Sequence, residues 1–410
     1  MVDSAPVRRI PISGWPRALA LAAALLASCA AEPAPGPVAA EGPGVVLISL
    51  DGTRPEDVIG AGLPAFDEIA RLGARAERLV PVFPTNTFPN HVTLVTGVRP
   101  ALHGIVNNAF ADPERGLFRY GGDPGWIEVE PLWSWVGRHG VVSASYHWVG
   151  SEGAWTSGRG PRHWKRFDGG TPEAEKVEQI LAWLDEPDPA ARPRLVTAWF
   201  HGADHEAHEH GPGSAEARRA LREQDAAVGE LLRGLRARDA LGRFTLVLVS
   251  DHGMAPVRRW IDLQQRLDEA GVRARVLGGG GFASLALDAG ALAGALRVAR
   301  EQGLEAWPRE EAPAELGLDH PRFGDAVVLA PPGTAIGRHG GAGGHGYRPE
   351  RPEMSAFLLA VGRGAEPGEE LGRLRALDVA PTLLALLGVP RPEWMEGRPV
   401  AALVPDEALP

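Results

Sequence analysis

The sequence has a single cysteine, no excess of basic residues, and no apolar run long enough to cross a membrane. The one cysteine, Cys29, excludes an intrachain disulfide framework. The formal net charge of −10 argues against a surface that coats nucleic acid or binds acidic lipids, although bound metal ions could still attract a nucleotide. No internal repeat or heptad pattern occurs. With 44% hydrophobic residues among 410, the chain can build a large buried core.

The N-terminal residues have the features of an export signal followed by a tether. Arginines precede the apolar run 18–27, which is too short to span a bilayer, and the sequence Leu-Ala-Ser-Cys ends at Cys29. This layout predicts a lipoprotein-type signal peptide over 1–28, cleaved before a lipidated Cys29; an ordinary cleaved signal is the alternative. The Pro/Ala/Gly-rich residues 29–43 are expected to form a flexible tether. We therefore expect an exported bacterial protein, in the periplasm or at the cell surface, anchored by lipid to the outer membrane.

Runs rich in β-branched residues alternate with amphipathic segments along most of the chain. Such runs suit strands that are buried on both faces of a parallel sheet, and the alternation predicts an α/β fold. The expected strands are 45–50, 141–146, 194–200, 244–250 and 355–361, and the expected helices are 65–79, 173–184, 215–238 and 376–387. Either Gly388 closes the last helix or Asp378 caps it.

Residues 260–336 interrupt this pattern with shorter apolar runs, several prolines and the tetraglycine 278–281. We expect an inserted cap of mixed strands and helices within a catalytic domain that spans residues 44–400. The Gly-rich stretch 338–347 is expected to return to the core, because glycine lets the backbone approach a site closely.

Polar side chains follow two of the expected strands. Asp51 comes directly after 45–50, and the pair Asp251-His252 follows 244–250. Open α/β sheets place their sites at the carboxyl ends of the strands, and an adjacent Asp-His pair can give a metal two ligands. The alternative for Asp51 is the N-cap of the next helix.

Residues 82–91 place Thr87 just ahead of an apolar run that predicts a helix. A helix N-terminus favours a phosphate, so Thr87 is a candidate nucleophile, but its hydroxyl needs an activator before it can attack. Taken alone, the stretch favours Thr87 as a helix cap, with Asn90 in the first turn. Two amides, Asn107 and Asn108, follow in a Gly-containing loop.

The segment 201–212 carries four histidines and three acids within ten residues, directly after an expected strand. A charged, solvated loop is the alternative to a metal-ligand cluster. With the strand ends, the chain supplies three carboxylates and three imidazoles around one hydroxyl: Asp51, Asp204, Asp251, His208, His252, His345 and Thr87. Mixed nitrogen and oxygen ligands suit zinc, and paired zinc ions suit phosphoryl transfer.

The stretches that carry these residues resemble the motifs of the nucleotide pyrophosphatase/phosphodiesterase family of the alkaline phosphatase superfamily, and they occur in the same order along the chain. The matching segments are 49–52, 84–91, 96–97, 103–105, 204–212, 250–254 and 344–347, and 377–382 has the character of the superfamily. The resemblance implies a three-layer α/β/α sandwich with a mostly parallel central sheet. It also implies two zinc ions and the hydrolysis of phosphodiester or phosphoanhydride bonds.

Carried over position by position, the resemblance implies a role for each residue. One zinc ion would be held by Asp204, His208 and His345, and the other by Asp51, Asp251, His252 and Thr87. Thr87 would attack and form a covalent phospho-threonine intermediate, while Asn108 and the Phe88 N–H would stabilise a phosphate oxygen. Phe88 and Trp199 would bind the nucleoside, with core packing as the alternative for Trp199.

Two of these histidines have competitors. His208 lies four residues after Asp204, as in the family, and competes with His201, His205 and His210. The Gly-His-Gly-Tyr pattern of the family fits His345 and does not fit His339.

The segment 148–152, Trp-Val-Gly-Ser-Glu, offers no cation, which favours a diester over a doubly charged monoester. We therefore expect a dizinc phosphodiesterase or nucleotide pyrophosphatase that binds a small-molecule phosphodiester or nucleotide and no nucleic-acid polymer. A phosphomonoesterase or phosphonate hydrolase on the same scaffold is the alternative enzyme. An inactive, metal-stabilised surface binding protein is the alternative from another class.

Overall fold

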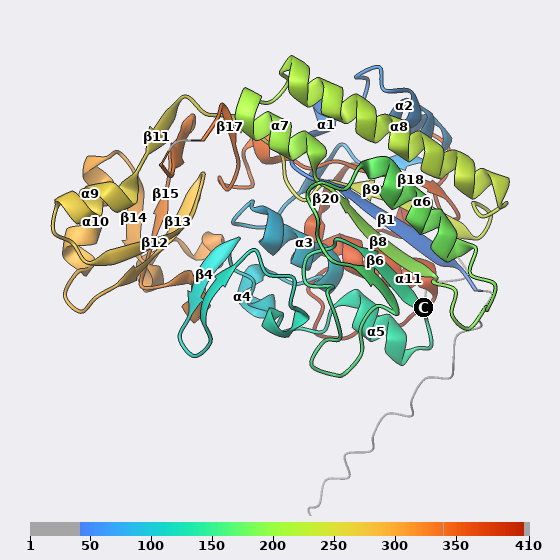
Figure 1. Ribbon diagram of the computed structural model, residues 1–410, viewed down its shortest axis with the longest axis horizontal. Coiled ribbons are helices and arrows are strands. Elements are labelled where there is room, and N and C mark those ends of the chain that lie inside the picture. The colour runs from blue at the N-terminus through green and yellow to red at the C-terminus, as the bar shows by residue number, and fades with distance from the viewer. Residues whose placement is uncertain (1–41, 339, 406–410) are drawn as a thin grey trace, which may run out of the picture. The chain divides into compact units, whose positions relative to one another are not determined.

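This computed structural model describes residues 42–338 and 340–405. The largest sheet in this part of the chain has eight strands (Figure 1). The strand order is β19-β2-β18-β9-β1-β8-β6-β7. Neighbours among β9, β1, β8, β6 and β7 run parallel, whereas β18 runs antiparallel to both of its neighbours. The strands are β1 (Gly44–Leu50), β2 (Ala74–Arg75), β6 (Ser143–Tyr146), β7 (His163–Lys165), β8 (Leu195–Phe200), β9 (Phe244–Val249), β18 (Leu358–Gly362) and β19 (Glu369–Glu370).

Helices cover both faces of this sheet. Every residue of β1, β8 and β9 is buried, because alternate side chains point into opposite helical layers. One layer contains α2 (Pro64–Leu72), α6 (Glu173–Leu184) and α8 (Ala215–Ala237). The other contains α3 (Thr87–Thr96), α5 (Leu132–Arg138) and α11 (Val379–Leu387). The predicted α/β/α sandwich with a mostly parallel sheet is confirmed.

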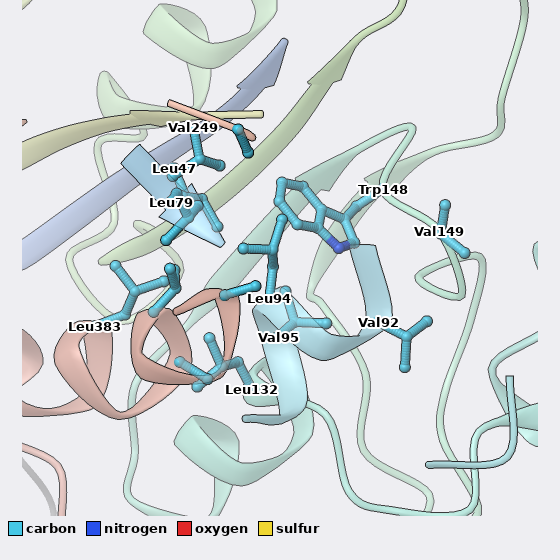
Figure 2. Packing of buried hydrophobic residues seen from close by; sticks show 14 of the residues in the cluster. Leu47, Leu79, Val92, Leu94, Val95, Leu132, Trp148, Val149, Val249 and Leu383 are labelled. Atoms are coloured by element: carbon cyan, nitrogen blue, oxygen red, sulfur yellow. The ribbon is translucent and has the colours of Figure 1, made fainter. Parts of the chain in front are cut away.

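The second layer fixes the position of α3, the helix that begins at Thr87. Figure 2 shows Leu47 of β1 and Val249 of β9 in the same hydrophobic cluster as Val95 of α3. Leu132 of α5 and Leu383 of α11 complete the cluster around this helix. Burying each such side chain contributes about 1.5–3 kcal/mol, so α3 is held firmly against the sheet.

A separate antiparallel sheet, of order β12-β13-β15-β14, lies within the segment 260–336. Its strands are β12 (Ala274–Gly279), β13 (Phe282–Leu287), β14 (Glu305–Pro308) and β15 (Ala326–Leu329). With α9 (Leu263–Glu269) and α10 (Leu292–Glu301), it builds its own hydrophobic core. Short strand pairs join it to the rest of the chain: β11 (Arg259–Ile261) with β16 (Thr334–Ile336), and β10 (Ala255–Pro256) with β17 (Gly343–Gly344).

The remaining α-helices and strands are short. They are α1 (Pro55–Val58), α4 (Pro100–His103), α7 (Gly202–His210), the hairpin of β4 (Ala109–Asp112) and β5 (Gly116–Arg119), and the pair of β3 (Arg78–Val80) with β20 (Arg373–Arg375). No helix in the described part of the chain is both long and apolar enough to cross a bilayer. The predicted signal peptide, Cys29, most of the tether and His339 lie outside the described residues.

Several expected elements differ from the structure. The helix predicted over 65–79 ends at Leu72, because the chain at Gly73 passes so close to β18 that a Cβ there would lie 1.9 Å from the Ala360 carbonyl oxygen. The residues that follow form β2 and β3. The strand predicted over 355–361 begins at Leu358. The segment 201–212, whose alternative was a solvated loop, contains the helix α7.

The end of α11 is settled by glycine. Gly388 adopts a left-handed conformation, with φ 68°, and terminates the helix as expected. The side chain of Asp378 does not cap the helix and instead pairs with Arg375.

His103, at the end of α4, makes stability depend on pH. Its fully buried ring accepts a hydrogen bond from the Ile105 N–H and contacts the Thr93 hydroxyl, and burial lowers its pKa to about 3. An unfolded histidine has a pKa of about 6.5, so between these values the unfolded chain binds more protons and stability falls as the pH falls.

We expect this one group to make folding about 2 kcal/mol less favourable at pH 5 than at pH 7. Urea unfolding of the wild type and of His103→Gln at both pH values measures the difference. Equal losses in the two proteins would contradict the prediction.

Candidate active site and metal centre

The carboxyl ends of the three central strands meet at one edge of the sheet. Leu50 of β1 pairs with Phe200 of β8, and Ser49 pairs with Val249 of β9. Asp51 and Asp251 follow directly, and the Gly52 N–H donates to Asp251 Oδ1 at 3.2 Å. Asp51 is therefore not a helix cap, since α1 begins only at Pro55.

Thr87 is the first residue of α3, and Asn86 is the N-cap residue. The interpretation of Thr87 as a helix cap is therefore wrong. Its Oγ1 lies 3.2 Å from Nε2 of His252. Asn90 holds the preceding turn instead: its Oδ1 accepts from the Val82 N–H at 2.8 Å, and its Nδ2 donates to the Asn86 carbonyl at 3.0 Å.

One group of possible metal ligands comes from α7 and from the loop after β17. Asp204 and His208 lie four residues apart on one face of the helix, and their ligand atoms lie within 4.8 Å of each other and of a His345 nitrogen. The competing histidines among the described residues belong to neither group of possible metal ligands. His201 contacts the Gly169 carbonyl, His210 lies 3.6 Å from a Glu206 oxygen, and the exposed His205 belongs to neither metal-ligand group.

A second group combines Asp51, His252 and, again, Asp204, with ligand atoms within 4.8 Å of one another. Asp251 adjoins this group, because its Oδ2 lies 3.1 Å from Nε2 of His252. The structure thus brings together every metal ligand that the sequence suggested. It adds that Asp204 borders both groups, which spacing along the chain does not reveal.

One oxygen atom of each of the three carboxylates lacks a hydrogen-bond partner among the described residues. Asp51 Oδ1, Asp204 Oδ1 and Asp251 Oδ2 are buried and accept no hydrogen bond within the described residues. Burial and the nearby charges of Asp251 and Asp204 raise the pKa of Asp51 well above its ordinary value. Uncompensated buried carboxylates are costly, so a cation between them fits this site.

The imidazoles are also oriented as metal ligands. In each ring Nδ1 faces a carbonyl oxygen, which can only accept: Gly253 O for His252 at 2.9 Å, Thr85 O for His345 at 3.0 Å and Gly343 O for His208 at 3.2 Å. Nδ1 therefore carries the proton and Nε2 keeps its lone pair for a metal. Burial, with the neighbouring His252 and His208, lowers the pKa of His345 and keeps its ring neutral.

An asparagine network connects His345, a candidate metal ligand, to the residues beside Thr87, since Asn86 Oδ1 lies 2.9 Å from His345 Nδ1. The Asn86 amide donates to Asn107 Oδ1 at 2.8 Å, and the same oxygen accepts from the Asn108 N–H at 2.8 Å. Asn108 Oδ1 in turn accepts from the Phe88 N–H at 2.8 Å. The Phe88 N–H thus has a partner in this structure, the side-chain oxygen of Asn108.

A cavity of about 400 Å³ opens over Thr87 and is lined by Asp51, Asp204, Asn108 and several aromatic side chains. The Trp199 indole N–H donates to Asp51 Oδ2 at 2.9 Å, and its ring stacks on Phe167 with centroids 4.8 Å apart. Trp199 therefore positions a metal-site carboxylate. This cavity, the aromatic pocket, also contains Tyr120, and the sequence analysis missed both Phe167 and Tyr120, which lie in irregular segments and carry no motif.

The chain is similar to known phosphodiesterases. Residues 45–349 match the sequence profile of the family described as type I phosphodiesterase/nucleotide pyrophosphatase. An uncharacterized pyrophosphatase/phosphodiesterase of Schizosaccharomyces pombe is 37% identical over 53% of this chain and 47% of its own length. Human ectonucleotide pyrophosphatase/phosphodiesterase family member 1 is 34% identical over 53% of this chain and 24% of its own length. The matches thus span less than half of these relatives.

Solved structures share the fold. Human ectonucleotide pyrophosphatase/phosphodiesterase 5 superimposes with a TM-score of 0.81 at 25% identity, covering 88% of this chain and 99% of the human one. The murine protein, an inactive threonine-to-alanine variant in complex with AMP, gives a TM-score of 0.79 at 24% identity, covering 85% of this chain and 96% of the murine one. By its sequence match and its fold, the chain belongs to the type I phosphodiesterase/nucleotide pyrophosphatase family of the alkaline phosphatase superfamily.

Proposed function

We propose that the chain hydrolyses phosphodiester or phosphoanhydride bonds with two zinc ions as cofactors and Thr87 as the nucleophile. The observation that carries the proposal is the position of Thr87 Oγ1, 3.2 Å from His252 Nε2 and beside carboxylate oxygens that lack partners. When bound, zinc ions supply the positive charge that lowers the pKa of a hydroxyl group. Asp204, His208 and His345 would hold one ion, and Asp51, Asp251, His252 and Thr87 the other.

Different residues of the chain would have different roles in the reaction. The bond between Thr87 Oγ1 and phosphorus forms as the bond to the leaving oxygen breaks, which gives a phospho-threonine that water then hydrolyses. The α3 N-terminus and the Asn108 amide favour negative charge on a non-bridging oxygen. Trp199 holds Asp51 in place through its indole N–H.

The aromatic pocket supports a nucleotide as the substrate. Phe88, Trp199, Phe167 and Tyr120 line it, and aromatic faces stack on bases with little dependence on base identity. The murine protein of this fold is described as binding AMP, and we propose the same class of ligand for this chain. The retained half of the substrate would then be a nucleoside monophosphate.

A comparison of two chromogenic esters tests this function. We expect the zinc-loaded protein to hydrolyse bis-p-nitrophenyl phosphate with a kcat/KM at least about tenfold above that for p-nitrophenyl phosphate. The reason is charge: among the described residues no lysine or arginine lines the aromatic pocket, whereas Glu152 does, so no side-chain cation is placed there for the second charge of a monoester.

A tenfold preference for the monoester would identify a phosphomonoesterase instead. Zinc-loaded protein that hydrolyses neither ester, nor a dinucleotide, would identify a metal-stabilised binding protein.

A further inference from the structure

A buried lysine contacts the strand that leads to the metal ligands. Lys176, on α6, is fully buried, although lysine seldom lies inside a protein unless its charge is paired. Its Nζ lies 2.6 Å from Oε2 of Glu173, one turn earlier on the same helix, and donates to the Trp199 carbonyl oxygen at 3.0 Å. Burial lowers the pKa of Lys176, and the Glu173 carboxylate opposes that shift. A charged pair is thus placed inside the protein, at the end of β8.

The Trp199 carbonyl lies just past the paired part of the sheet. The register of β6 with β8 ends at Ala198. On the opposite side of β8, the Phe200 carbonyl still accepts from the Asp51 N–H at 2.9 Å. Because successive residues of a strand direct their backbone groups to opposite sides, the Trp199 carbonyl faces the side on which β6 has ended. Lys176 therefore takes the place of a strand neighbour there.

The same pair reaches the start of α7, the helix that carries two of the candidate metal ligands. The Gly202 N–H, at the first residue of α7, donates to Oε1 of Glu173 at 3.4 Å. Nε2 of His201 lies 3.1 Å from the Gly169 carbonyl oxygen, which can only accept. Nδ1 of His201 therefore keeps its lone pair, and it accepts from Lys176 at 3.4 Å. His201, which competed in the sequence as a metal ligand, contacts the buried lysine instead.

We propose that Lys176 is a positioning residue for the metal centre. Its ammonium group fixes the end of β8, so that the Trp199 indole N–H stays 2.9 Å from Asp51 Oδ2 and holds that carboxylate in the geometry that binds zinc. Trp199 transmits the effect, because its main chain contacts Lys176 and its side chain contacts Asp51. The inference rests on the proposed function, since it gives Lys176 a part in holding the proposed cofactor.

Replacing the lysine with methionine tests this role. Lys176→Met keeps the apolar part of the side chain but leaves the Glu173 carboxylate buried without its cation, so the zinc-loaded chain should unfold at a lower urea concentration. The Kd of the first zinc ion that a chromophoric chelator withdraws should rise about tenfold. This is the lower end of the range for residues that orient a metal ligand, because Lys176 acts through Trp199.

A second substitution separates positioning from stability. In Lys176→Met/Glu173→Gln neither charge of the pair remains, so the protein should regain most of its urea midpoint while the Kd for zinc stays raised about tenfold. Glu173→Gln alone should do the reverse. It leaves the ammonium group on the Trp199 carbonyl, so the Kd should change less than about threefold, whereas the unpaired lysine should lower the urea midpoint.

Two further proteins control the experiment. Lys165→Met is the matched substitution, because Lys165 is exposed on β7 and does not line the aromatic pocket, and it should change neither quantity. Trp199→Phe lacks the indole N–H. If Lys176 acts through Trp199, adding Lys176→Met to Trp199→Phe should raise the Kd less than about threefold further.

Three results would overturn the inference. The first is zinc affinity that recovers together with stability in the double variant, since the pair would then have a structural role only. The second is a further loss of about tenfold on adding Lys176→Met to Trp199→Phe. The third is an unchanged Kd in Lys176→Met, which would overturn the inference while the proposed function stands. Wild-type protein that takes up no zinc would contradict both.

Discussion

Replacing Thr87 with alanine is expected to lower kcat by at least about 10⁴-fold and to leave the metal content unchanged. The substitution removes the attacking Oγ1 and leaves every other side chain of the two metal-ligand groups in place. Thr87 is the first residue of α3, a position where alanine is well tolerated, so the fold should be preserved. Steady-state kinetics on bis-p-nitrophenyl phosphate, with metal analysis of the same sample, measure both quantities.

Thr96→Ala is the control for this variant. Thr96 is buried on the same helix and donates its hydroxyl hydrogen to the Val92 carbonyl at 2.7 Å, away from the metal ligands. Its loss should cost a fraction of the folding stability and change kcat less than about threefold. If the Thr87→Ala protein kept a tenth of the wild-type rate, Thr87 could not be the nucleophile.

Asp204→Ala should have the largest effect on the metal centre. Asp204 belongs to both groups of ligand atoms, so its removal should reduce the metal content from about two zinc ions per chain to one or none, and kcat by at least about 10³-fold. A free zinc concentration of about a thousand times the Kd stabilises the native state by about 4 kcal/mol. Because the variant loses this stabilisation, its midpoint of thermal unfolding should fall as well.

His210→Ala provides the comparison on the same helix. His210 is exposed and lies 3.6 Å from Glu206, outside both ligand groups. This variant should keep two zinc ions and wild-type activity. Loss of zinc in His210→Ala, or two retained ions in Asp204→Ala, would show that the ligand sets are assigned wrongly. Elemental analysis after dialysis against dilute zinc measures the content directly.

The central sheet could be predicted because its strands are apolar on both faces. The runs that form β1, β8 and β9 can be buried only between two layers of helices, and that requirement is visible in the sequence. The end of α2 could not be predicted, because it depends on the close approach of Gly73 to β18, which lies almost 290 residues later in the chain. Helix periodicity gives no information about such a contact.

The site, like the fold, could be predicted from the sequence only in part. Asp51 and Asp251 could be placed because parallel strands end at one edge of the sheet. The hydrogen bond from Trp199 to Asp51, and the shared position of Asp204, depend on side-chain geometry across three strands. Phe167 and Tyr120 come from irregular segments without periodicity or motif, so only the folded chain shows that they line the aromatic pocket.

The stereochemical course at phosphorus tests the covalent role of Thr87 most directly. The measurement uses a thymidine 5′-phosphorothioate p-nitrophenyl ester of known configuration, hydrolysed in ¹⁸O-labelled water. Attack by Thr87 followed by attack of water involves two in-line displacements, each of which inverts phosphorus, so overall retention is the predicted result. Overall inversion would mean that water attacks the substrate directly, and it would contradict a phospho-threonine intermediate.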